Sequence, residues 1–412
     1  MRVGIFSIFS ELHNPEKIKQ MQEKLRSCLF PMQKTDWVVN NNFSEFDVIL
    51  VCIFTGGSEA AFVKSWPELA SLNKPMALLA LTSDNSLPAA LEIKSWLNQN
   101  KTGPVMPLIH GNPKEIADKT GQFYQLAKIR LELGQSNIGV IGRPSDWLIA
   151  SNADYKKYQQ RFGINFTEIA MNEFKNLLQN ISAATGEMFK EKFAQDGEIS
   201  LSELIKAEKI YLALKRVIKN YGLTALTIRC FDILDCEKTT GCLALAALND
   251  EGIVAGCEAD VPAAVSMLIG EKVASSPVFM ANPASVRGDE AVFAHCTVPC
   301  KILRNFSLDS HFESGLGLAV AGNFAPGPIT LFKLDCLAEK FVVAEGEIVK
   351  AEHAQNLCRT QIRTKIVAIE DYLLKTPLGN HQIIIPGHYA EKIRQLLAAV
   401  GFKSVWDQPA LP

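Results

Sequence analysis

Two acidic residues and one amide flank the most apolar part of this chain, where each would be costly to bury. Glu258 and Asp260 stand immediately before the apolar run 261–269, and a strand-like segment, 277–281, leads to Asn282. A buried carboxylate costs free energy unless it is paired or bound to a metal ion. The spacing therefore predicts either buried ion pairs or a metal site at this point in the chain.

The same residues also have ordinary structural explanations. Glu258 suits a helix N-terminus, where the helix dipole favours an acid, and Asn282 suits the opening of the turn Asn-Pro-Ala. The amide oxygen of Asn282 can still bind a hard cation, but an amide does not ionise and cannot act as a general base.

Histidines supply further candidates in the last third of the chain. His381 lies in Gly-Asn-His just before the apolar strand 383–385, and His388, which follows Pro-Gly, is its rival as a ligand or else caps the last helix. His295 ends an apolar strand, and His311 precedes a glycine-rich run. For each of these histidines a hydrogen-bonded place in the core is the alternative.

A short polar cluster, Arg359-Thr360-Gln361, lies between His311 and His381 in the chain. Arginine with glutamine suits a phosphate, a carboxylate or a ligand with many hydroxyl groups. The alternative for this cluster is the solvated face of a strand.

The elements that must position these residues change character along the chain. Residues 1–134 alternate continuous apolar strands with helices, which indicates a parallel sheet covered on both faces, and residues 135–276 repeat the alternation. From residue 277 strand-like runs separated by Gly and Pro dominate. The chain is therefore predicted to fold as two doubly wound α/β domains followed by a β-rich, mostly antiparallel C-terminal domain, 277–412.

Composition excludes several classes of function. The 412 residues carry a net charge of −2, so no basic footprint indicates nucleic acid or a membrane surface. No apolar run approaches the roughly 20 residues that span a bilayer, and no GxGxxG follows a strand, so no nucleotide cofactor is expected. Ten cysteines without a CxxC pair are typical of reduced core thiols in a cytoplasmic protein.

The segment around Glu258 resembles the active-site segment of L-fucose isomerase and its relatives, the fucose/arabinose isomerase superfamily. That family has Glu-x-Asp, an apolar helix and a strand ending in Phe-Ala-Asp, which Cys257–Asp260 and Phe279–Asn282 match at the same separation. Asn282 departs from the pattern, because the family has Asp there. Further segments that resemble the family are Phe293–Cys296, His311–Gly315, Cys358–Gln361 and Gly379–His381.

The resemblance implies a metal-dependent aldose–ketose isomerase with a barrel-like C-terminal domain, working through a cis-enediol as a homo-oligomer on a small sugar. It implies Glu258, Asn282 and His381 as ligands of Mn²⁺, or of another divalent cation such as Mg²⁺. Glu258, or Asp260, would move the proton.

His295, His311, Arg359 and Gln361 would contact the sugar. The alternative that Asn282 supports is a carbohydrate-binding or catalytically impaired homologue. A purely structural or interaction protein ranks last, because repeats and heptads are missing from the sequence.

Overall fold

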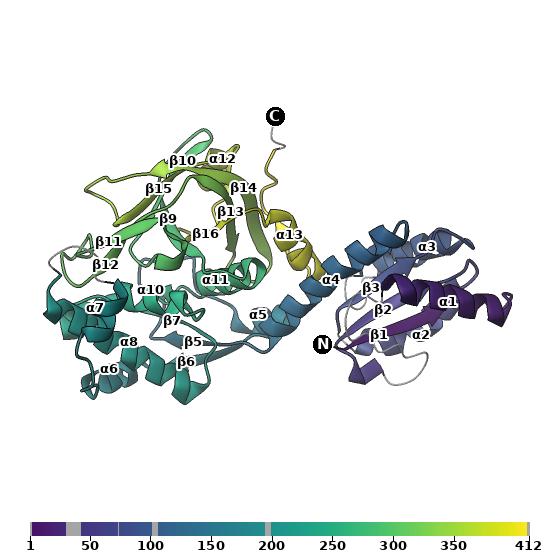
Figure 1. Cartoon of the computed structure of the whole chain (residues 1–412), viewed down its shortest axis with the longest axis horizontal. Coiled ribbons are helices and arrows are strands. Elements are labelled where there is room, and N and C mark those ends of the chain that lie inside the picture. Colours follow the sequence, from purple (N-terminus) through teal and green to yellow (C-terminus); the bar gives the residue numbers. More distant parts are fainter. Residues whose placement is uncertain (1, 30–42, 73, 101–105, 194–198, 410–412) are drawn as a thin grey trace. The chain divides into compact units, whose positions relative to one another are not determined.

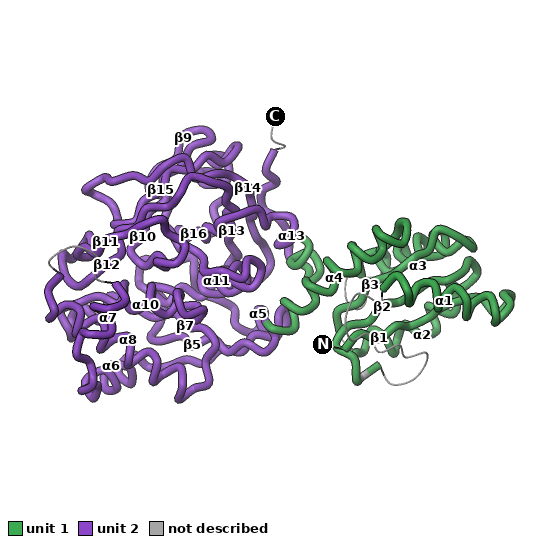
Figure 2. Tube along the Cα trace, viewed as in Figure 1, with its two compact units in different colours: residues 1–132, 395–401 green, residues 133–394, 402–412 purple. Residues whose placement is uncertain are grey.

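The computed structural model describes residues 2–29, 43–72, 74–100, 106–193 and 199–409. Its contacts divide the chain into two compact units, residues 1–132 with 395–401 and residues 133–394 with 402–412 (Figure 2). The boundary predicted at residue 277 lies inside the second unit, which holds both the second α/β region and the β-rich region.

Unit 1 is built on a four-stranded parallel sheet. Its elements are β1 Val3–Ile8, α1 Pro15–Leu29, the short η1 Phe43–Glu45, β2 Val48–Ile53, α2 Glu59–Ser71, β3 Met76–Ala80, α3 Ser86–Asn100, β4 Leu108–His110 and most of α4 Pro113–Gly134. The strands lie in chain order, β1-β2-β3-β4. Alternate residues of β2 enter two core clusters, one shared with α2 and α3 and the other with α1 and α4. The sheet is therefore covered on both faces, which explains its continuous apolar strands.

Unit 2 begins with a second four-stranded parallel sheet. Its elements are β5 Asn137–Ile141, α5 Tyr155–Phe162, β6 Asn165–Ile169, α6 Met171–Gln179, α7 Glu187–Phe193, α8 Leu201–Tyr221, β7 Ala225–Ile228, α9 Phe231–Glu237, α10 Cys242–Asp250, β8 Val254–Cys257 and α11 Val261–Ala274. The strand order is β6-β5-β7-β8. The chain therefore adds β6 on one side of β5 and then returns to add β7 and β8 on the other. Ligands of open α/β sheets bind beyond the carboxyl ends of the strands at such a reversal.

The rest of unit 2 is an antiparallel barrel. Its strands are β9 Phe279–Arg287, β10 Glu290–His295, β13 Gly327–Leu334, β14 Lys340–Ala351, β15 Thr360–Lys365, β16 Gln382–Pro386 and the short parallel β17 Lys403–Ser404. The order β13-β16-β9-β10-β15-β14 closes on itself because β14 also pairs with β13. Outside the barrel lie η2 Cys300–Ile302, the hairpin β11 Asn305–Asp309 and β12 Ala319–Asn323, α12 Ile369–Lys375 and α13 Ala390–Ala399. The predicted fold class, parallel α/β sheets followed by an antiparallel barrel, is confirmed.

Helix α11 joins the two halves of unit 2. It packs on β7 and β8 of the parallel sheet and on β9, β13 and β16 of the barrel, and Figure 1 shows it between them. Nearly all of its residues are buried, so its sequence is apolar on every side. Ser266 Oγ accepts a hydrogen bond from Leu334 N at 3.0 Å, which fixes the helix against β13.

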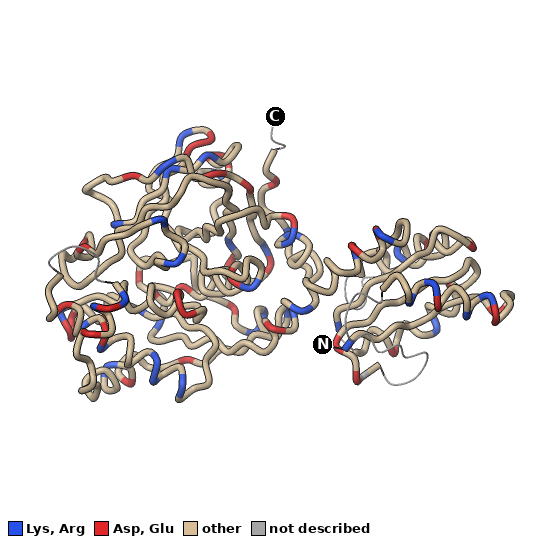
Figure 3. Tube along the Cα trace, viewed as in Figure 1, with Lys and Arg blue, Asp and Glu red and all other residues tan. Residues whose placement is uncertain are grey.

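The distribution of charged residues and the character of the helices agree with what the sequence indicates. In Figure 3 basic and acidic residues are interspersed along both units, in keeping with the net charge of −2. None of the helices in the described part of the chain combines the length and apolar character needed to cross a bilayer.

Candidate metal centre

The segment after β8 leaves the sheet through an unusual backbone conformation. Glu258 and Ala259 have φ of 62° and 52°, in the left-handed region. This conformation costs non-glycine residues about 1–2 kcal/mol each and persists only where the surroundings hold it. Ala259 N donates to Ile228 O at 3.0 Å, and Ser145 N donates to Glu258 O at 3.0 Å. These bonds hold the turn, which lies at the carboxyl end of the sheet beside the reversal.

Three side chains from different elements converge beyond this turn. Glu258 comes from the loop after β8, His295 ends β10, and His381 stands just before β16. One ligand atom of each lies within 4.8 Å of the others, and all three residues are buried. The barrel supplies both histidines because β10 and β16 each pair with β9. We call Glu258, His295 and His381 the Glu-His-His cluster.

In both imidazole rings the Nδ1 atom contacts a polar group of the protein. His381 Nδ1 lies 2.8 Å from Asp260 Oδ2, and its Nε2 lies 3.7 Å from Glu258 Oε1 with no hydrogen bond among the described residues. His295 Nδ1 lies 2.9 Å from Thr297 Oγ1 and 3.3 Å from Thr297 N. In each ring Nε2 is therefore the nitrogen left for a ligand. Metal-binding histidines are typically held in this way through the second nitrogen.

Electrostatics sets the protonation of the cluster. Burial raises the pKa of Glu258, but its contact with His381, the charges of His381 and His295 and a bond from Trp147 bring the pKa below its ordinary value. Burial and the neighbouring His381 lower the pKa of His295 to about 3. Burial also lowers the pKa of His381, but its bonds to Asp260 and Glu258 outweigh this effect and raise it. The anionic carboxylate and the neutral imidazole are the forms that bind cations, so Glu258 and His295 are in the binding forms, whereas a cation at His381 would have to displace the proton that its raised pKa favours.

Asp260 supports the cluster from inside the protein. Its Oδ1 accepts from Ala263 N at 2.9 Å and caps α11. Its Oδ2 contacts His381, and Lys333 Nζ lies 3.5 Å away, with both side chains fully buried. Burial raises the pKa of Asp260, but Lys333, His381 and the Ala263 N–H lower it well below its ordinary range. The structure thus places Asp260 in contact with His381 and outside the cavity lining.

A cavity of about 60 Å³ opens on the cluster, lined by Glu258 and His295 together with Asn282 and His311. Asn282 lies on β9 opposite Ala294. Its Oδ1 is buried and has no hydrogen-bond partner among the described residues, as suits an oxygen kept for a ligand. His311 Nδ1 lies 3.1 Å from Ser314 Oγ. Four residues predicted from the sequence therefore meet at one cavity.

The structure does not bring Arg359 and Gln361 to that lining. Arg359 Nε donates to Ser310 O at 2.7 Å and lies 3.4 Å from Asp309 Oδ2. Gln361 is buried, and both of its polar atoms bond the backbone of Ala354 at 2.8 Å. Among the histidines, His388 pairs with Glu345 at 2.7 Å, apart from the cluster.

Sequence reasoning missed two residues that hold the site. Trp147 Nε1 donates to Glu258 Oε2 at 2.6 Å from the loop that follows β5. Its signal was its position just after the first strand of unit 2. Lys333 lies in the apolar strand β13, where a lone cation among apolar residues indicates a buried partner.

Comparison with known proteins finds distant relatives. A sulfoquinovose isomerase from Alkalicoccus urumqiensis is 21% identical in an alignment 337 residues long that covers 74% of this chain and 74% of the relative. One from Clostridium sp. (strain MSTE9) is 26% identical over 239 residues, 54% of this chain and 51% of the relative.

A third, from Priestia aryabhattai, is 22% identical over 303 residues, 65% of each. The chain thus spans about half to three quarters of the length of these relatives. No protein-family model matches the chain. All three relatives align with more than half of this chain, and all three are named as sugar isomerases.

Proposed function

We propose that this protein is a metal-dependent aldose–ketose isomerase acting on a sugar. The names of the distant relatives support a sugar isomerase. The observation that carries the proposal is the convergence of the buried residues Glu258, His295 and His381 within 4.8 Å of one another, beside a cavity that Glu258 and His295 line. The expected homo-oligomer and the cytoplasmic location stay predictions.

The donor set fits a divalent cation. The cluster offers a carboxylate and two imidazole nitrogens, and the Oδ1 of Asn282, which has no hydrogen-bond partner among the described residues, supplies a further oxygen. Oxygen and imidazole donors suit Mn²⁺. When bound, such a cation polarises the carbonyl and the adjacent hydroxyl of the sugar. Glu258, His295, His381 and Asn282 are thus the four residues that would hold the cation.

Glu258 is the residue that we propose moves the proton. It takes a proton from the carbon next to the carbonyl and returns it to the neighbouring carbon of the cis-enediol. Trp147 holds Oε2 at 2.6 Å, which leaves Oε1 directed toward His381. Asp260 keeps the His381 ring in place, and His311 offers a polar contact to a sugar hydroxyl.

Asn282 also favours a second candidate, a carbohydrate-binding or catalytically impaired homologue. The amide stands in the cavity with Glu258, yet it cannot share acid–base work. This candidate binds a sugar and a metal ion without turnover.

Metal analysis of the purified chain, followed by a screen of aldoses, ketoses and sulfoquinovose with added Mn²⁺, tests both candidates. Turnover that needs Mn²⁺ and disappears in Glu258→Gln supports the isomerase. Sugar binding measured by calorimetry without turnover supports the second candidate. Absence of both metal and sugar binding contradicts both.

A further inference from the structure

Half of the cysteines of this chain gather at one place. The sequence has ten, and all ten are free thiols in the structure. The five that line the cavity beside the Glu-His-His cluster are Cys230, Cys242, Cys257, Cys296 and Cys358. The proposed isomerisation uses none of these thiols, so their position calls for a different chemistry.

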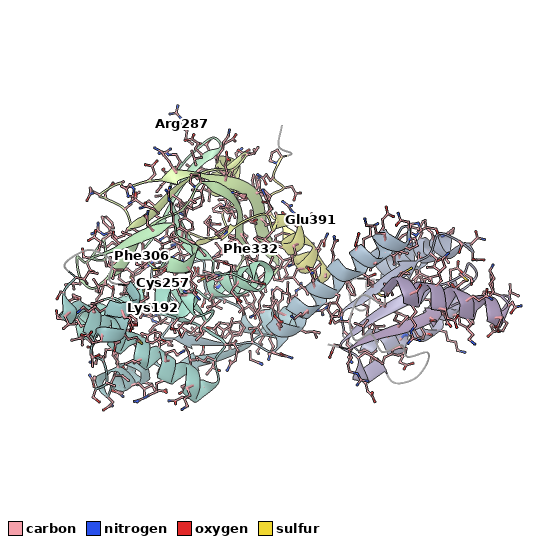
Figure 4. The ribbon with its side chains drawn as sticks, in the orientation of Figure 1. Lys192, Cys257, Arg287, Phe306, Phe332 and Glu391 are labelled. Carbon is pink, nitrogen blue, oxygen red and sulfur yellow. The ribbon has the colours of Figure 1, made fainter. Side chains whose placement is uncertain are left out.

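Cys296 and Cys358 are hydrogen-bonded to each other, and a second pair of these thiols is also in direct contact. Cys230 and Cys257 have their sulfur atoms 2.9 Å apart, and both residues are buried. Cys257 ends β8, and Cys230 lies two residues after β7, which is the strand beside β8. The two sulfurs need to approach by less than about 1 Å to reach the disulfide distance of about 2.05 Å. Figure 4 labels Cys257, which lies inside unit 2.

The cavity gives a small oxidant a way in. Its volume of about 60 Å³ exceeds the room that a single water molecule needs, so a molecule the size of hydrogen peroxide fits beside the pair. Both sulfurs belong to residues of the lining. The two residues therefore form a pair of adjacent thiols, a dithiol, that a small molecule in the cavity can reach.

We propose that Cys230 and Cys257 are a site of covalent modification by peroxide, which closes them into a disulfide and disables the adjacent Glu258 centre. One thiol reacts with hydrogen peroxide to give a sulfenic acid and one water molecule. The second thiol then displaces the sulfenic hydroxyl as a second water and forms the S–S bond. The two sulfurs lose two electrons in total, and the peroxide gains them.

The consequence for the centre follows from the chain itself. Cys257 is covalently joined to Glu258, whose left-handed backbone is held by neighbouring bonds. Drawing the Cys257 sulfur toward Cys230 shifts this turn and the Glu258 carboxylate with it. A displacement of about 1 Å in a catalytic group costs on the order of 100-fold in rate. The oxidised protein is expected to bind Mn²⁺ at least tenfold more weakly and to regain its affinity with dithiothreitol.

Peptide mapping tests the bond directly. Trypsin releases Cys230 in peptide 230–238 and Cys257 in peptide 239–272. The variant Cys236→Ser/Cys242→Ser leaves one thiol in each of these peptides. Reduced protein is treated with hydrogen peroxide, its remaining thiols are alkylated, and the digest is weighed by mass spectrometry. The expected product is the linked pair 230–238/239–272, which is absent after dithiothreitol and absent from Cys230→Ser.

Cys296→Ser in the same background provides the matched control, because Cys296 lines the same cavity and its loss should leave the linked pair intact. Oxidation that appears only as a linked pair 288–301/351–359, which joins Cys358 to Cys296 or Cys300, overturns the assignment. Single-thiol oxidation without any linkage overturns it as well. The mapping needs no activity, so it decides the dithiol proposal even if the reduced protein binds no Mn²⁺ and the proposed function fails.

Discussion

In the described part of the chain, each of the two parallel sheets has four strands, but the carboxyl ends of these strands differ. In unit 1 those ends carry small hydroxyl residues whose bonds go to the backbone: Thr55 Oγ1 accepts from Ser10 N at 2.9 Å, and Ser86 Oγ accepts from Leu81 N at 2.7 Å. In unit 2 they carry Trp147 and Glu258, which bond each other at 2.6 Å. Groups of three metal-binding side chains in the described residues occur in unit 2 alone.

Strand order and the barrel explain this contrast. Among the described residues, the strands of the first sheet lie in chain order, whereas the second sheet reverses between β5 and β7. The loops at a reversal diverge and leave room for a ligand. The barrel then adds His295 and His381 above that opening. A parallel sheet alone is thus a scaffold, and the site arises where a reversal meets a second layer.

Removing the Glu258 carboxylate should have the largest effect. Glu258→Gln keeps the size of the side chain but takes away the anionic member of the cluster and the proposed base. We expect activity to fall by at least about 10³-fold, measured as kcat. We expect Mn²⁺ affinity to fall by at least about tenfold, measured by calorimetry. Glu313→Gln is the matched control, since Glu313 lines the same cavity outside the cluster.

Lys333→Met tests the layer behind the cluster. Asp260 and Lys333 are both fully buried, and removal of one partner of a buried pair costs about 3–5 kcal/mol. His381 still contacts Asp260, so we expect a loss near 3 kcal/mol in the free energy of unfolding, read from denaturant titration. The exposed Lys365→Met should change it by less than about 0.5 kcal/mol. Equal effects for the two variants would contradict the role given to Lys333.

Asn282→Asp should sharpen the contrast between the sheets. The new carboxylate adds an anion beside the cluster, and a unit charge pair about 4 Å apart is worth on the order of 4 kcal/mol near a protein surface. We expect Mn²⁺ affinity to rise by at least about tenfold, which is about 1.4 kcal/mol. Turnover should rise too if the parent is impaired. Equal or weaker binding in calorimetry would show that position 282 does not face the metal.

The smallest effect should come from unit 1. Thr55→Val removes the oxygen that accepts from Ser10 N and leaves that buried N–H unpaired. The expected loss is about 1 kcal/mol of unfolding free energy, with Mn²⁺ affinity unchanged. A large loss of metal binding in this variant would contradict the view that the sheet of unit 1 takes no part in the metal site of unit 2.

Much of the fold could be predicted from local pattern. The alternation of apolar strands and helices in residues 1–134 and 135–276 predicts the two parallel sheets, and the strand-like runs from residue 277 indicate the antiparallel strands. Closure of the barrel could not be predicted in this way, because β16 pairs with both β9 and β13, which are far from it in the sequence, and such pairing depends on side-chain packing.

The site was predictable where one segment carries it. Glu258 and Asp260 stand out because acids beside an apolar run need partners. Lys333, which contacts Asp260 from 73 residues further along the chain, had no local signal that named its partner. Gln361 shows the opposite case: a polar residue in a strand suggested a ligand contact, but its amide serves the backbone of Ala354.

The Asp260 carboxylate has a consequence for how this sequence can vary. One oxygen caps α11 and the other positions His381, so a single side chain serves both the core and the centre. An asparagine there could keep the cap through its carbonyl oxygen but would turn an NH₂ donor toward the ring. A serine could cap the helix but is too short to reach His381. Substitution at position 260 is therefore limited by two separate requirements, the helix cap and the contact with His381. A change in the chemistry of this centre would more easily begin with a substitution of Asn282.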